Sequence, residues 1–68
     1  MRYRELVKKL RRLDCEYVRP AGGSHEIWHN PQTGGVTVIP HHTREIAKKT
    51  LGKILRQLGL KYKDLHGM

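Results

Sequence analysis

The stretch of the chain that decides the fold runs over residues 25–40 and reads HEIWHNPQTGGVTVIP. Its second half, 36–39, is rich in β-branched residues, which favour strands, and its middle consists of residues typical of a turn. The sequence therefore predicts two antiparallel strands, 25–29 and 36–39, joined by a hairpin. Pro40 lacks an amide hydrogen, so we expect it to end the second of these strands.

A helix and a further strand are predicted before this hairpin. Apolar side chains recur at the i, i+3, i+4, i+7 spacing of an amphipathic helix over residues 3–13. The helical period is lost between Cys15 and Arg19, which favours a short strand, and Pro20-Ala21-Gly22-Gly23 then predicts a loop.

A second helix is predicted after the hairpin. Its apolar face would carry Ala47, Leu51, Ile54, Leu55 and Leu58, with Ile46 off that face. Two starts remain open: near Thr50, acting as N-cap after a turn over 43–49, or near Arg44 with a bend. Gly59 is placed to end the helix. The sequence thus predicts one α+β domain, 1–68, of order α-β-β-β-α, with both helices on one face of a three-stranded antiparallel sheet.

The composition points to a polyanionic ligand. The 68 residues include 14 Lys and Arg against 6 Asp and Glu, a net charge of +8 with histidine neutral. A chain this short buries only about 60% of its unfolded surface, which excludes a deep active-site cavity. The charge is spread along the chain, and aromatic residues are few, so the phosphate backbone of nucleic acid is favoured over a stacked cofactor. The alternative is a basic surface that only keeps the protein soluble.

The sequence also predicts the cellular compartment. The single cysteine, Cys15, excludes an internal disulfide and makes a reducing cytosol the default. No apolar run approaches the roughly 20 residues of a membrane span, and residues 1–5 do not read as a signal peptide. We therefore expect a cytoplasmic protein that binds no membrane.

Five histidines are the candidates for chemistry: His25, His29, His41, His42 and His66. A metal site is disfavoured, because His25 and His29 would stand roughly 13 Å apart on an extended strand, and we expect neither metal nor cofactor. Cys15 fits a small buried thiol better than the nucleophile of a Cys and His pair. His41 and His42 read as exposed turn residues, and His66 as part of a frayed tail without a role.

The loop Gly22-Gly23-Ser24-His25 carries the strongest local signal. Glycines permit a close turn and let a phosphate approach the backbone amides, while histidine exchanges protons near neutral pH. The alternation of the strand leaves the direction of His25 open. If Ile27 is the core residue, His25 faces the core side, and if Trp28 is, His25 faces solvent.

Two groups of cations lie on the predicted helices and are candidates for RNA binding. The members are Arg4, Lys8 and Arg11 in the first helix and Lys48, Lys49, Lys53 and Arg56 around the second. Their alternative role is solubility.

Taken together, these motifs resemble the HicA family. The resemblance rests on Gly23-Ser24-His25 opening a strand, Pro40 with His42 two residues on, and the helix 50–60, which reads TLGKILRQLGL. HicA proteins are the toxins of HicA and HicB toxin-antitoxin pairs. The resemblance implies a fold like a double-stranded RNA-binding domain, a ribosome-independent mRNA interferase and a HicB-type antitoxin as partner. The catalytic histidine of the family corresponds to His25.

RNA cleavage needs no metal in principle, because the ribose 2′-OH is an internal nucleophile. We expect His25 to transfer a proton, as base or acid, with His42 or water as the second proton carrier and cations and loop amides stabilising the phosphate. A non-catalytic RNA-binding module and a protein-interaction domain are the alternatives. The net charge predicts an antitoxin with an acidic contact surface over 22–25, and the oligomeric state stays open, a homo-oligomer included.

Overall fold

Three antiparallel strands form one sheet in the order β1-β2-β3. The computed structural model describes residues 1–41 and 45–66. The strands are β1 (Glu16–Pro20), β2 (His25–Asn30) and β3 (Gly35–Pro40), and β2 and β3 pair from His25 opposite Pro40 to Asn30 opposite Gly35. The predicted hairpin is confirmed, and Pro40 is the last residue of its second strand. The register of β1 against β2 shifts between Tyr17 and Arg19, a bulge at Val18.

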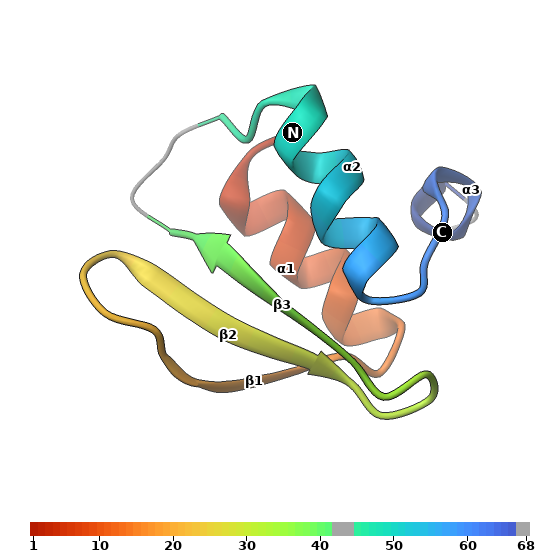
Figure 1. Cartoon of the computed structure of the whole chain (residues 1–68). Helices are drawn as coiled ribbons and strands as arrows, with labels where there is room; N and C mark the ends of the chain where they lie inside the picture. The colour runs from red at the N-terminus through yellow and green to blue at the C-terminus, as the bar shows by residue number, and fades with distance from the viewer. Residues whose placement is uncertain (42–44, 67–68) are drawn as a thin grey trace.

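Two helices cover the same face of this sheet, as predicted: α1 (Tyr3–Arg12) and α2 (Lys48–Gln57) (Figure 1). Glu5 in the first turn of α1 and three cations in its last turn suit the helix dipole. A third helix, α3 (Tyr62–His66), follows beyond the end of α2. The prediction of a frayed tail was wrong, because Leu65 of α3 is fully buried and anchors this segment.

The core lies between the sheet and the helices. Its buried side chains are Leu6, Leu10, Cys15, Trp28, Ile39, Ile46, Leu51, Ile54, Leu55, Leu58 and Leu65. Trp28 is 1% exposed, so it is Trp28 and not Ile27 that faces the helices. Since side chains alternate along a strand, His25, Ile27 and His29 lie on the open face of the sheet. Cys15 is the buried thiol that the sequence predicts, and its burial raises its pKa.

The start of α2 differs from both predicted starts. The helix begins at Lys48 with Ala47 as N-cap, so Thr50 lies inside the first turn and caps nothing. Ala47 is exposed, whereas Ile46 is buried. Ile46 precedes the helix, and its amide donates to the carbonyl of Met1 (2.7 Å), a contact that helical spacing does not describe. The predicted end is confirmed, because Gly59 follows the helix with φ at +71°.

The C-terminal end of α2 is fastened to the hairpin. The carbonyl of Leu58 accepts hydrogen bonds from Asn30 Nδ2 (2.9 Å) and Thr33 Oγ1 (2.8 Å). A Cβ added to Gly35 would come within 2.3 Å of the carbonyl oxygen of Gln57, so only glycine permits this approach of strand to helix. We call this part of the molecule, residues 30–37 with 57–59, the closed end. The opposite end of the sheet carries His25.

Candidate active site

His25 is the first residue of β2 and follows a tight loop. The amide of Ala21 donates to the carbonyl of His25 (2.9 Å), and the amide of His25 donates to the carbonyl of Gly22 (3.2 Å). Gly22 and Gly23 have φ of +87° and +55°, the left-handed region that glycine favours. The two glycines therefore let the chain reverse within three residues and place His25 at the rim of the sheet.

A second contact fixes this loop from the side of β3. The amide of His41, directly after β3, donates to the carbonyl of Ser24 (2.8 Å). Pro40 pairs with His25 across the two strands. The loop and the residues after β3 are thereby held beside each other, and we call residues 21–25 with 40–41 the open end.

A hydrogen-bond network supports the open end from the helix side. Glu26, next to His25 but on the other face, accepts hydrogen bonds from the Tyr3 hydroxyl and from Trp28 Nε1 (3.1 Å). The ring of Tyr3 lies 6.0 Å from that of His41. Burial and then the hydrogen bond to Glu26 raise the pKa of Tyr3 to about 12. The Tyr3 hydroxyl therefore stays protonated at neutral pH and keeps α1 attached to the strand that carries His25.

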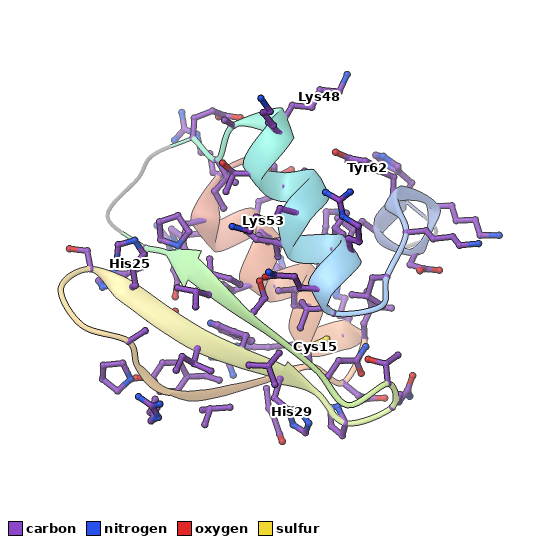
Figure 2. The ribbon with its side chains drawn as sticks, in the orientation of Figure 1. Cys15, His25, His29, Lys48, Lys53 and Tyr62 are labelled. Atoms are coloured by element: carbon purple, nitrogen blue, oxygen red, sulfur yellow. The ribbon has the colours of Figure 1, made fainter. Side chains whose placement is uncertain are left out.

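A groove of about 310 Å³ lies beside His25, between β3 and α2. Its lining residues are His25, Val38, Pro40, Thr50, Lys53, Ile54 and Gln57. Figure 2 shows Lys53 reaching from α2 toward the end of the sheet where His25 lies. The groove thus brings together a histidine and a lysine that are 28 positions apart in the sequence.

The remaining candidate cations lie elsewhere. The guanidinium of Arg11 stacks over the ring of Trp28 (5.2 Å), which itself contacts Tyr17 of β1, so this side of α1 faces the β1 edge of the sheet. Arg56 lines a different groove, between α2 and α3, together with Tyr62. The other exposed cations of this group are Arg4, Lys8, Lys48 and Lys49. Of the seven predicted cations, the described structure places Lys53 in the groove with His25.

None of the other histidines that the structure describes lines this groove. His29 lies on the open face near the closed end, where its Nδ1 is 3.1 Å from an oxygen of Glu16. His41 is exposed, as predicted, and His66 lies in α3. His42 lies outside the described residues. Among residues 1–41 and 45–66, no three His, Cys, Asp or Glu side chains gather into a group that could hold a metal ion.

The sequence analysis missed two polar residues of the groove, Thr50 and Gln57. With Lys53 they stand at i, i+3 and i+7, so the pattern of one helix face was visible in the sequence. The sequence does not show that this helix face lies against β3, because that contact depends on tertiary packing and not on a local pattern.

The fold and the site together define a class of protein. It is a small basic α-β-β-β-α domain in which a histidine and a lysine line one groove beside an exposed loop. A family model described as the HicA toxin of bacterial toxin-antitoxin systems matches residues 3–60 of the 68. The chain belongs to this family of toxins, and the family implies a cognate antitoxin as its partner. No curated protein matches the chain significantly. In the part of the chain that the structure describes, no helix is long and apolar enough to cross a membrane.

Proposed function

We propose that the protein is a toxin that cleaves mRNA without the ribosome and that His25 is its catalytic residue. The observation that carries this proposal is the groove that His25 shares with Lys53 at the open end. A proton carrier beside a cation supplies two of the functions that cleavage of an RNA phosphodiester requires, proton transfer and stabilisation of charge on the phosphate. Membership of a toxin family supports the same reading.

The proposed reaction uses the RNA itself as nucleophile. The 2′-oxygen attacks the adjacent phosphorus, the bond from phosphorus to the 5′-oxygen breaks, and the products are a 2′,3′-cyclic phosphate and a 5′-hydroxyl. One proton leaves the 2′-OH and one is delivered to the 5′-oxygen. His25 carries one of these protons, and His42 or water carries the other. The charge that develops on the phosphate is stabilised by Lys53 and by amides of the 22–24 loop.

We further propose that the exposed cations of both helices attract the RNA backbone without reading its sequence. Those of α1 are Arg4, Lys8 and Arg11, and those of α2 are Lys48, Lys49, Lys53 and Arg56. The antitoxin would inhibit the toxin by covering residues 22–25 with an acidic surface, because a domain of this size is too small to hide His25 in a deep cleft of its own. In the complex, cleavage should then be lost together with solvent access to His25.

A pair of matched variants tests the proposed activity. His29 lies on the same strand and the same face as His25, but at the other end and away from the groove. His25→Ala should abolish cleavage of a single-stranded RNA by the purified protein while RNA binding persists, and His29→Ala should cut at the wild-type rate. If a folded His25→Ala protein still cleaves, the catalytic assignment is wrong. If the wild-type protein binds RNA without cutting it, the protein is a binding module instead.

A further inference from the structure

The groove between β3 and α2 has the make-up of a nucleotide site. We propose that it holds one unpaired nucleotide of single-stranded RNA next to the phosphate on which His25 acts, and that Gln57 and Thr50 contact its base. This inference rests on the proposed function and extends it to the form of RNA and to the choice of cleavage site.

The shape and apolar floor of the groove suit a base. Its volume, about 310 Å³, lies at the lower end of the range for small-molecule sites. Val38, Pro40 and Ile54 provide apolar surface, against which the flat face of a base can pack. Since the groove opens at the rim where His25 lies, the phosphate of a nucleotide seated there would meet the histidine and Lys53.

The charge of the groove favours an anionic ligand over a basic peptide segment. Among the lining residues that the structure describes, none is acidic and Lys53 is the one lysine or arginine. A single cation beside an apolar floor matches a nucleotide, which has one phosphate for each base. An antitoxin segment that reaches the same groove is the competing occupant, and the experiment below separates the two.

The structure holds Gln57 in position before any ligand binds. The Thr37 hydroxyl, buried beneath the helix, donates to Oε1 of Gln57 (2.7 Å). Because the oxygen is engaged, the amide nitrogen of Gln57 is the polar end that remains for a base edge. A fixed donor discriminates between bases, since a base without an acceptor at that place leaves the donor unpaired.

The groove also selects the form of the RNA. A base can enter it only when it is unstacked and unpaired, which is how proteins usually read RNA sequence. Double-stranded RNA, with its bases held inside the helix, offers no base to this groove. We therefore infer that unpaired segments of mRNA are the substrate.

The first test compares cleavage patterns. Gln57→Glu keeps an oxygen for the Thr37 hydroxyl but removes the amide donor, and Gln32→Glu makes the same change in the exposed hairpin turn. Both variants and the wild type would cut a pool of random single-stranded RNA, and the cut ends would be sequenced. Gln57→Glu should change the base preference beside the cut by about 2- to 10-fold, and Gln32→Glu should not. Unchanged preference with His25-dependent cleavage intact would overturn the groove assignment and leave the nuclease standing.

The second test does not depend on cleavage. In the His25→Ala background, binding of a short single-stranded RNA would be measured by fluorescence anisotropy. Arg56→Gln measures the general effect of losing one charge from α2, because Arg56 lines the other groove. Lys53→Gln should weaken binding about 10-fold beyond that effect, and pairing the RNA with its complement should remove the difference. Equal losses for the two variants would overturn the proposal. If Lys53→Gln weakens RNA binding as expected but the wild-type protein does not cut RNA, the groove is a nucleotide site and the proposed nuclease activity is wrong.

Discussion

The two ends of the sheet differ in how the chain is held. At the closed end, the backbone of β3 touches that of α2 at Gly35, and the Leu58 carbonyl accepts two side-chain hydrogen bonds. At the open end, an added Cβ on Gly22 or Gly23 would meet nothing within 4 Å. The closed end therefore contributes stability, and the open end leaves room for a ligand beside His25. In so small a domain, the closest backbone packing and the candidate catalytic histidine lie at opposite ends of one sheet. Gln57 connects the two, because its backbone meets Gly35 and it also lines the groove with His25.

The largest effect should come from His25→Ala, which tests the open end. We expect cleavage to fall by about 10²- to 10⁴-fold, because a proton carrier is lost, and induced expression should no longer arrest growth. The free energy of unfolding, measured in urea, should change by less than about 0.5 kcal/mol, since the side chain is exposed. A clear loss of stability would show that the side chain of His25 itself contributes to folding.

Gly35→Ala tests the closed end, and we expect the opposite result: a loss of stability rather than a loss of the proton carrier. The new Cβ would lie 2.3 Å from the carbonyl oxygen of Gln57 and 2.9 Å from Cα of Leu58, both backbone atoms. We expect a loss of about 1–3 kcal/mol in the free energy of unfolding, typical of overpacking. Val36→Ala is the control, because Val36 is 53% exposed beside it and should cost far less. An equal loss of unfolding free energy for Gly35→Ala and Val36→Ala would contradict the close approach of β3 to α2.

Tyr3→Phe should weaken the support behind the open end by a smaller amount. Loss of the hydrogen bond to Glu26 should cost about 0.5–1.5 kcal/mol at pH 8. Because folding raises the pKa of Tyr3 from 10.0 to about 12, this stabilisation is present below pH 10 and is lost as the pH rises through about 12. The difference between wild type and variant should therefore shrink over that interval. A difference that stays constant would mean that the hydroxyl does not titrate as its surroundings indicate.

The smallest expected effect tests how far the RNA-binding surface extends from the open end. Lys8→Gln and Lys53→Gln should each reduce the slope of log affinity against log salt by about 0.7, the value for one phosphate of a single strand. Of the two variants, only Lys53→Gln should also lower cleavage at saturating RNA, because Lys53 lines the groove with His25 and Lys8 does not. An unchanged slope for Lys8→Gln would limit the contact to the open end and assign the α1 cations to solubility.

The elements that the sequence predicted correctly are those with local causes. The hairpin follows from β-branched strands and a turn, α1 from its apolar period, and the end of α2 from Gly59. The start of α2 depends instead on the contact of Ile46 with Met1, 45 positions away, and α3 on the burial of Leu65. For the site, the Gly-Ser-His motif located the loop, but the direction of His25 needed the burial of Trp28. Its neighbours on the groove come from another element, so only the packing of α2 on β3 reveals them.

The left-handed backbone of the 22–23 loop has a consequence for chemical synthesis of the protein. A D-amino acid has the opposite hand at Cα and therefore prefers positive φ, so D-alanine at Gly22 fits the φ of +87° without strain in the folded protein. In the unfolded chain, the same residue has fewer accessible conformations than glycine. Such a residue should stabilise the protein by about 0.4–1 kcal/mol through the entropy of the unfolded state. The same replacement stiffens the loop without touching His25. The rate of the proposed RNA cleavage by that synthetic toxin, compared with the rate of the natural one, would report whether the loop must flex for cleavage.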